Sequence, residues 1–379
     1  MKRIAIFCDG TWNRADAPHA TNVVKLSQAM SFVDDKGVFQ QMSYIQGVGT
    51  GRGTGKFAKL VDRFGGSAFG WGLTQNIEEA YRGLAFSYQP GDEIYIFGFS
   101  RGAYTARSLA GLIRSSGIPP RTRIDKIPAA IARYRSGADG THPNDPASFE
   151  FRRDMNADVV TSAEEAAWRR EKGLTEGVML NIAYVGVWDT VGALGVPGHL
   201  GMLAKVFNQK YRFHDAALSR SVRAARHAVA IDERRRTFPP TLWDNLDTLN
   251  GETTGNERPY RQLWFPGNHG SVGGGGDIVG LSDDALVWIA EGAQGMGLKF
   301  EQELLDWHRG QCDYLAPVSN TTVNKAGMFD RILSKMTRDR TGPDQIGLLA
   351  KATLKRWKEA SPKYRPKTLE KVARQLDEL

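Results

Sequence analysis

The segment Gly98-Phe99-Ser100-Arg101-Gly102 places a serine between two glycines, each two positions away from it. The residues before it predict a buried strand over 93–98, and those after it predict a helix over 103–113. A serine on a sharp strand-to-helix turn is exposed as a nucleophile, and a side chain in place of Gly98 or Gly102 would collide with the neighbouring strand and helix. Glycines that only ease a tight turn are the alternative. The strand and helix on either side favour Ser100 as a nucleophile.

A serine hydroxyl needs a base to accept its proton and a carboxylate to orient that base. In α/β-hydrolases the acid and then the histidine follow the serine along the chain. Among the seven histidines we select His269, because it lies in a glycine-rich loop directly after a short apolar strand over 263–265. Asp189 ends a predicted strand over 182–188, and sites in α/β proteins assemble at this end of a strand. We therefore expect Ser100, Asp189 and His269 to form a catalytic triad.

Other residues compete for the roles of acid and base. Asp277 and Asp232 are the reserve acids, because Asp189 could simply form a turn. His269 could only cap its glycine loop. His227 falls in a helix predicted around 221–231, so we expect it to be structural.

Backbone amides near the serine are candidates for an oxyanion hole. The amide of Arg101 begins the predicted helix and is one expected donor. Asp9-Gly10-Thr11-Trp12 follows the first predicted strand, and Gly10 or Thr11 is expected to supply the second amide. Asp9 would hold this turn by accepting hydrogen bonds. A purely structural turn is the alternative.

No cofactor or metal site is predicted. Residues 47–56 look like a phosphate loop, but Thr50 replaces a required glycine and Phe57 replaces the residue that would hold magnesium. The four glycines over 273–276 lack the acidic spacing of a calcium-binding repeat. Cys8 and Cys312 are the only cysteines, and they predict neither a disulfide framework nor a cysteine-based metal site.

Short apolar strands alternate with helices through the first half of the chain, a pattern that predicts an α/β-hydrolase fold with a mostly parallel central sheet flanked by helices. We expect one catalytic domain over 1–340. It would include a helical cap inserted at about 120–177, which would shape the acyl pocket, and a variable loop at about 192–220. Residues 341–379 are expected to form a basic helical segment packed on this domain.

The composition is that of an ordinary globular protein, with 379 residues of which 41% are hydrophobic and 24% are charged. No apolar run approaches the roughly 20 residues that a membrane-spanning helix needs, and no secretory signal is predicted, so we expect a cytoplasmic protein or one exported without such a signal. The formal net charge is +8, with basic clusters over 220–236 and 351–367. Such clusters are expected either to lie on a solvated face or to bind an anionic membrane surface. No nucleic-acid-binding motif accompanies them, and nothing in the sequence fixes the oligomeric state.

The chain resembles a bacterial family of formerly unknown function that includes the class-one type VI secretion phospholipase effectors. The resemblance runs in order over about the first 300 residues. Its similar stretches are Ile6 to Asn13, Gly47 to Gly51, Gly98 to Ala103, Val187 to Gly192, Asp232 to Arg234, Trp264 to His269 and Leu281 to Asp283. The family pattern places Ser-Asp after the histidine, where this chain has Gly270-Ser271.

The resemblance implies an α/β-hydrolase domain with its triad on Ser100, Asp189 and His269, and hydrolysis of phospholipid esters by the secreted members. Together with the residues, it predicts a serine hydrolase that cleaves carboxylic esters through an acyl-enzyme, with a lipid or phospholipid as substrate. The alternatives are an esterase acting on small or polymeric esters and a non-catalytic binding protein on the same fold.

Overall fold

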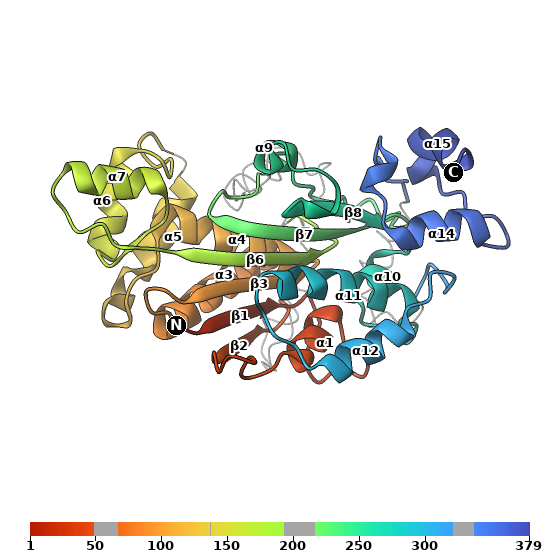
Figure 1. Ribbon diagram of the computed structural model, residues 1–379, viewed down its shortest axis with the longest axis horizontal. Coiled ribbons are helices and arrows are strands. Elements are labelled where there is room, and N and C mark those ends of the chain that lie inside the picture. The colour runs from red at the N-terminus through yellow and green to blue at the C-terminus, as the bar shows by residue number, and fades with distance from the viewer. Residues whose placement is uncertain (49–66, 137, 193–216, 321–336) are drawn as a thin grey trace.

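The computed structural model describes residues 1–48, 67–136, 138–192, 217–320 and 337–379. Its centre is a six-stranded sheet in the order β2-β1-β3-β6-β7-β8, in which each pair of neighbouring strands is parallel (Figure 1). The strands are β1 (Arg3–Cys8), β2 (Gln40–Ile45), β3 (Glu93–Phe99), β6 (Asn181–Trp188), β7 (Val222–Ala230) and β8 (Tyr260–Phe265). The predicted α/β class, with a mostly parallel sheet flanked by helices, is confirmed.

Both faces of the sheet are covered by helices. Ile4 and Ile6 of β1 pack on one face with α3 (Ser67–Ser87) and α4 (Arg101–Ser116). Ala5 and Phe7 point to the other face, which is covered by the helices α1 (Asn22–Ala29), α11 (Gly280–Gly295) and α12 (Gln302–Gln311). A parallel sheet buried on both faces needs apolar residues at successive positions of a strand. This explains why β1 and β3 are apolar along most of their length.

The register of the parallel strands brings the predicted site residues to one edge of the sheet. Cys8 pairs with Gly98, Gly98 pairs with Val187, and Trp188 pairs with Ala228. Each predicted site residue follows one of these strand ends. Asp9, Ser100 and Asp189 therefore leave the sheet at its carboxyl edge.

The segment around residues 221–231 forms the strand β7, so the predicted helix there is wrong. Alanines and regularly spaced arginines give this segment a helical pattern. In the structure it lies between β6 and β8, where Val222, Ala225 and Ala228 are fully buried. Sheet pairing and burial on both faces outweigh the local preference for a helix.

The inserted region between α4 and β6 is mainly helical. It contains η1 (Arg121–Lys126), α5 (Ile127–Ser136), α6 (Pro146–Met155), β4 (Val159–Val160), α7 (Ala163–Glu171) and β5 (Val178–Met179). It starts where α4 ends and stops where β6 begins, so it lies at the amino edge of the sheet, opposite the triad (Figure 1). The expectation that this insertion shapes an acyl pocket over Ser100 is therefore wrong.

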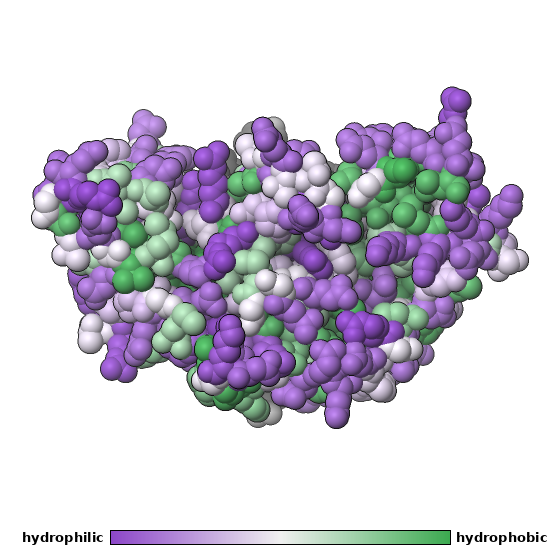
Figure 2. All heavy atoms as spheres, viewed as in Figure 1, coloured by the Kyte–Doolittle hydropathy of each residue, from purple (hydrophilic) through white to green (hydrophobic). Residues whose placement is uncertain are grey.

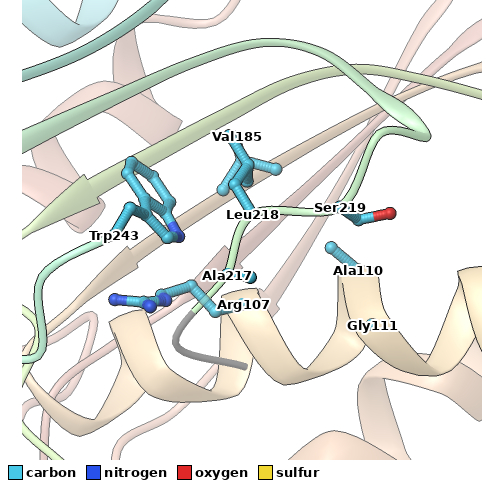
Figure 3. Close-up of a pocket in the computed structure, with 8 residues that line it drawn as sticks. All are labelled: Arg107, Ala110, Gly111, Val185, Ala217, Leu218, Ser219 and Trp243. Carbon is cyan, nitrogen blue, oxygen red and sulfur yellow. The ribbon is translucent and has the colours of Figure 1, made fainter. Parts of the chain in front are cut away.

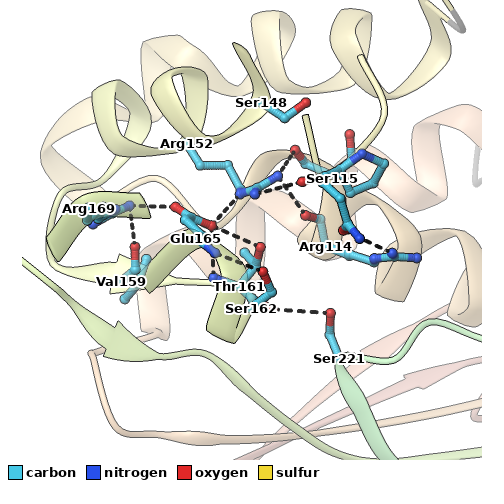
Figure 4. Close-up of polar contacts among 12 residues, drawn as sticks. Arg114, Ser115, Ser148, Arg152, Val159, Thr161, Ser162, Glu165, Arg169 and Ser221 are labelled. Carbon is cyan, nitrogen blue, oxygen red and sulfur yellow. Dashed lines mark hydrogen bonds and ion pairs between the residues drawn. The ribbon is translucent and has the colours of Figure 1, made fainter. Parts of the chain in front are cut away.

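A buried ion-pair network holds the insertion together (Figure 4). The Glu165 carboxylate accepts hydrogen bonds from Arg152 Nε and Arg169 Nη2, both at 2.7 Å, and from the backbone and hydroxyl of Thr161. The side chains of Arg152, Glu165 and Arg169 are at most 1% exposed. Arg152 also donates to the carbonyl of Ser115 at the end of α4. The network thus joins the insertion to the central domain.

The C-terminal segment packs against the β7–β8 side of the sheet. Its elements are η4 (Ile346–Leu348), α14 (Lys351–Glu359), η5 (Lys367–Val372) and α15 (Ala373–Asp377). Trp357 and Leu369 from this segment form a buried cluster with Val229, Ile231 and Trp264 of the sheet region. Within the described residues, the remaining elements are the short helices α9 (Leu246–Asn250), η3 (Gly255–Glu257) and α10 (His269–Gly273).

Some predictions lie outside the described residues, namely most of the glycine-rich segment 47–56 and most of the variable loop at 192–220. Among the helices that the structure describes, none combines the length and apolar character needed to cross a membrane.

We predict that Glu165→Gln destabilises the protein by about 3 to 5 kcal/mol, because it leaves the buried Arg152 and Arg169 without a counter-charge. Urea denaturation followed by circular dichroism measures this loss. Glu176→Gln is the control, because it breaks an ion pair with the exposed Arg170. This variant should leave the urea midpoint unchanged. A Glu165→Gln midpoint equal to that of the wild type would contradict the assigned role of the network.

Candidate active site

Ser100 lies on a strained turn between β3 and α4. Its φ of 59° is in the left-handed region, which is unusual for a residue with a side chain. A Cβ added to Gly98 would lie 2.4 Å from the Gly102 carbonyl oxygen, and one added to Gly102 would lie 2.2 Å from the Cys8 carbonyl oxygen. The close approach of β1, β3 and α4 therefore requires glycine at both positions.

Ser100, His269 and Asp189 form a continuous chain of hydrogen bonds. His269 Nε2 lies 2.8 Å from Ser100 Oγ, and His269 Nδ1 lies 2.6 Å from Asp189 Oδ2. With a carboxylate at Nδ1, the proton of a neutral imidazole is held on Nδ1, and Nε2 is left to accept the serine proton. The structure thus brings together the three residues that the sequence analysis selects.

The protonation states of this chain follow from burial and nearby charges. Burial lowers the pKa of His269 below its ordinary value, although the neighbouring Asp189 carboxylate opposes this effect. Burial alone would raise the pKa of Asp189, but the charges and hydrogen bonds of Arg340 and His269 hold it well below its usual range. A neutral imidazole beside an ionised carboxylate is the state that a general base requires at neutral pH.

Sequence reasoning missed Arg340, which binds the acid of the triad. Its Nη1 donates to Asp189 Oδ1 at 2.6 Å and its Nη2 donates to Asp189 Oδ2 at 2.9 Å. The Ala230 amide donates a further hydrogen bond of 2.9 Å to Oδ1. Arg340 lies just before the basic segment 341–379, and no motif distinguishes it from nearby arginines such as Arg338.

The turn after β1 lies against Ser100, because a Cβ added to Gly10 would be 3.1 Å from Ser100 Cβ. The Gly10 amide donates to Asp9 Oδ1 at 2.7 Å, whereas the Thr11 amide and hydroxyl have no hydrogen-bond partner within the described residues. Of the two predicted donors, Thr11 is therefore the one whose amide is available. Arg101 is the first residue of α4, where helix amides point out of the N-terminus.

Asp9 holds this turn in place. Its Oδ2 accepts hydrogen bonds from Thr21 Oγ1 at 2.8 Å and from Tyr44 Oη at 2.7 Å. Burial raises the pKa of Asp9 to about 6, although the hydrogen bonds from Tyr44, Thr21 and Gly10 act in the opposite direction. Asp9 thus ties β1 to α1 and β2, next to the Gly10 turn that lies against Ser100.

The loop that carries His269 is held by residues that follow β7. Glu233 Oε2 accepts the His269 amide at 3.2 Å, and Asp232 Oδ2 accepts the Gly267 amide at 2.7 Å. The rings of Phe99 and Phe238 flank the imidazole, with centroid distances of 4.7 and 4.9 Å. Asp232 therefore supports the histidine loop through the backbone.

Ser100 and Asp189 occupy both ring nitrogens of His269, so neither reserve acid, Asp232 or Asp277, binds the imidazole. His227 lies in β7, where its Nε2 accepts the Thr190 amide at 3.1 Å and its Nδ1 lies 2.9 Å from Gln262 Oε1. Burial lowers the pKa of His227 to about 3. It is thus a neutral histidine, hydrogen-bonded on both sides, and it stands outside the triad.

Two hollows lie away from the triad. The smaller is lined by Arg107, Leu218, Ser219 and Trp243 between α4 and β7, and its volume of about 10 Å³ is that of one water molecule (Figure 3). The larger, of about 310 Å³, is lined by Arg3 and Asp34 among others, at the amino edge of the sheet. Within the described part of the chain, no group of three histidine, cysteine or acidic side chains could hold a metal.

Comparison with known proteins identifies the family of this chain. A family model described as "T6SS, Phospholipase effector Tle1-like, catalytic domain" matches residues 2–292. The chain belongs to this family. Membership confirms the resemblance found in the sequence and supports a hydrolase function for this Tle1-like chain.

Three similar proteins are each longer than this Tle1-like chain. It is 28% identical over 248 residues to the uncharacterized protein YEL023C of Saccharomyces cerevisiae, a match that covers 62% of this chain and 32% of the yeast protein. An uncharacterized protein from Pseudomonas aeruginosa, solved by crystallography, matches 88% of this chain and 52% of its own, with 19% identity and a TM-score of 0.42. The Tle1 effector bound to the VgrG spike of the Type 6 secretion system matches 74% of this chain and 52% of its own, with 18% identity and a TM-score of 0.37. The chain thus spans about half of these two solved structures and a third of the yeast protein.

We predict that the stability contributed by Asp9 falls as the pH rises. Because its folded pKa of about 6 lies above the unfolded value, the folded protein binds this proton more tightly than the unfolded chain does. The free energy of unfolding of the wild type, relative to that of Asp9→Asn, should fall by roughly 2 to 3 kcal/mol between pH 4 and pH 8. Urea denaturation of both proteins across this range measures it. A difference that stays constant or rises with pH would contradict the prediction.

Proposed function

We propose that this protein is a serine hydrolase that cleaves carboxylic esters through an acyl-enzyme intermediate. The observation that carries the proposal is the chain of hydrogen bonds from Ser100 Oγ through His269 to the buried Asp189 carboxylate. A serine so connected can lose its proton to the imidazole as it attacks. Membership in the Tle1-like family adds independent support.

In the proposed mechanism, Ser100 Oγ attacks the ester carbonyl carbon while its proton passes to His269 Nε2. The Arg101 and Thr11 amides stabilise the negative charge that develops on the carbonyl oxygen. Collapse of the intermediate breaks the ester bond, and the His269 imidazolium protonates the departing alcohol. A water molecule then gives a proton to His269 Nε2 as its oxygen attacks the acyl carbon. The bond between the acyl carbon and Ser100 Oγ breaks, the carboxylic acid is released, and the imidazolium returns its proton to Ser100 Oγ.

The proposed substrate class is a lipid ester, specifically a phospholipid. The family is described as one of phospholipase effectors, and this is the basis for choosing lipid over a small or polymeric ester. The inserted helices at the amino edge do not enter this choice, because they lie away from Ser100. The acyl group must instead be accommodated at the carboxyl edge.

The basic clusters are less available to an anionic membrane than their sequence suggests. Arg234 pairs with Asp339 at 2.9 Å and Arg235 pairs with Glu233 at 2.7 Å. Arg356 is buried and donates to the carbonyl of Tyr314. Exposed charges remain at Arg236, Lys351, Lys355, Lys363 and Lys367, and the face drawn in Figure 2 is hydrophilic over most of its area. We propose that these remaining charges give a weak, salt-sensitive attraction to anionic lipid.

We predict that Ser100→Ala abolishes covalent labelling by a fluorophosphonate and lowers ester turnover by roughly three to six orders of magnitude, because the members of a triad act as a unit. His269→Ala should behave in the same way, and Asp189→Asn should be severely impaired. Turnover of p-nitrophenyl esters and of defined phospholipids by the purified proteins measures the loss. His227→Gln is the control for a buried histidine outside the triad. A folded Ser100→Ala protein that keeps a tenth of the wild-type rate would refute the mechanism.

We predict that binding to phosphatidylglycerol vesicles weakens steeply as salt rises, since each charge near the surface contributes about 1 kcal/mol and is screened beyond about 8 Å at physiological ionic strength. Co-sedimentation across a salt series measures this binding. Turnover of a soluble short-chain ester should stay nearly constant over the same series. No binding to anionic vesicles at low salt would remove the proposed attraction and favour a soluble ester as substrate.

A further inference from the structure

The carboxylate of Asp189 is held from two sides. His269 Nδ1 lies against Oδ2, and on the other side the Arg340 guanidinium bridges both oxygens at 2.6 and 2.9 Å. Asp189 is fully buried and Arg340 is only 8% exposed, so water does not screen the pair. A bidentate ion pair of this kind restricts the rotation of the carboxylate and also stabilises its negative charge. The orientation in which Asp189 faces the imidazole is therefore set in part by Arg340.

Arg340 is itself held in place by its other contacts. Its two terminal nitrogens donate to the carbonyls of Ala230 and Phe238, each at 2.8 Å. Ala230 ends β7 and also donates its amide to Asp189, while the Phe238 ring packs edge-on against His269. Arg340 thus connects the acid of the triad to the two segments that border its base.

The backbone before Arg340 is paired with the segment after β7. Thr337 forms an antiparallel bridge with Arg235, and the Arg338 amide donates to the Arg234 carbonyl at 2.7 Å. Asp339 pairs with Arg234. The side chain that follows this short pairing enters the site.

The rest of the C-terminal segment anchors this pairing to the sheet. Thr368 Oγ1 donates to the Ile231 carbonyl at 3.0 Å, and a Cβ added to Gly342 would lie 1.7 Å from the Thr368 carbonyl oxygen. Tyr364 Oη donates to Asp232 Oδ2 at 2.6 Å, the oxygen that also receives the Gly267 amide of the histidine loop. The C-terminal segment therefore contacts residues next to both members of the pair: Ile231 follows Ala230, which binds Asp189, and Asp232 holds the backbone before His269.

We propose that Arg340 is a positioning residue of the active site and that residues 337–379 belong to the catalytic unit, although they lie beyond the residues 2–292 that the family model matches. This inference rests on the proposed function of the same site. Arg340 holds Asp189 ionised and turned towards His269. It also limits how strongly Asp189 can stabilise the imidazolium that forms when Ser100 loses its proton.

The second effect follows from the charges that face His269. Asp189 at the end of β6 and Glu233 after β7 favour the imidazolium, whereas Arg235 opposes it. We infer that the positive charge of Arg340, bonded to Asp189, opposes it as well. Of these cations, Arg340 is bonded to the same carboxylate as the imidazole. Removal of its charge leaves Asp189 less compensated, so the pKa of His269 rises. A residue that only anchored the C-terminus would leave this pKa unchanged.

The test compares Arg340→Met with the wild type in two measurements. The rate of reaction of Ser100 with a fluorophosphonate should fall about a hundredfold, because the acid and base lose their alignment. The pKa of the His269 imidazole, followed by NMR in a Ser100→Ala background that needs no substrate, should rise by about one unit. The acid limb of the labelling rate should move to higher pH by the same amount. Arg340→Lys should bring the pKa back towards the wild-type value and restore part of the rate.

The controls separate the inference from the proposed function. Arg374→Met changes an exposed arginine of the same segment and should leave both measurements at wild-type values. Arg340→Gln, which keeps hydrogen-bond donors without the charge, gives the same test if the methionine variant does not fold. A folded Arg340→Met or Arg340→Gln protein with a wild-type labelling rate and an unchanged His269 pKa would overturn the inference alone. Absence of Ser100 labelling in the wild type would overturn the proposed function, and the NMR titration would still test the effect of Arg340.

Discussion

A fully buried carboxylate is the constraint on which the site depends. Asp189 is removed from water, where an ionised group is tolerated only if it is paired and hydrogen-bonded. Four hydrogen bonds meet this need, from the Ala230 amide, His269 Nδ1 and two nitrogens of Arg340. These donors come from β7, from the first residue of α10 and from the C-terminal segment. Contacts from all three segments thus stabilise the buried charge, so the carboxylate proposed as the catalytic acid is also part of the packing of the fold.

The turn that carries Ser100 depends on a different constraint, the close approach of backbone to backbone. Gly98 and Gly102 let β3 and α4 meet, and Gly47 lies so near Gly10 that an added Cβ would be 1.7 Å from the Gly10 carbonyl oxygen. Ser100 and Asp189 both have positive φ, at 59° and 36°, which the surrounding packing must support. Gly273 leaves room for the Phe99 ring, and that ring flanks His269. Small residues thus bring the turn, the base and the oxyanion donors within reach of one another.

How much of this the sequence can predict depends on how local the signal is. The glycines around Ser100, the strand before Asp189 and the loop of His269 are local patterns, and they indicate the three residues that the structure brings together. The segment over 221–231 carries a local pattern too, but burial between β6 and β8 overrides it. Arg340 and Glu233 have no local signal, because their roles arise only from contacts across the fold. The position of the inserted helices can be predicted from chain topology, because a segment that joins a helix to the next parallel strand begins and ends at the amino edge of the sheet.

Several basic residues near the C-terminus are buried or stacked in the fold and are not free at the surface. In the sequence the cluster over 351–367 suggests a surface, yet Arg356 is buried against backbone carbonyls and Arg365 stacks on Trp357 at 3.8 Å. Arg340, which precedes this cluster, is buried against Asp189. Arginine suits such positions because its planar guanidinium can satisfy several acceptors at once and stack on rings. Part of the positive charge of this region therefore serves to hold the C-terminal segment against β7, β8 and the triad. A net charge counted from the sequence therefore overstates the charge that is left to attract a membrane, and the proposed lipid substrate would have to bind at the carboxyl edge of the sheet, where Ser100 lies.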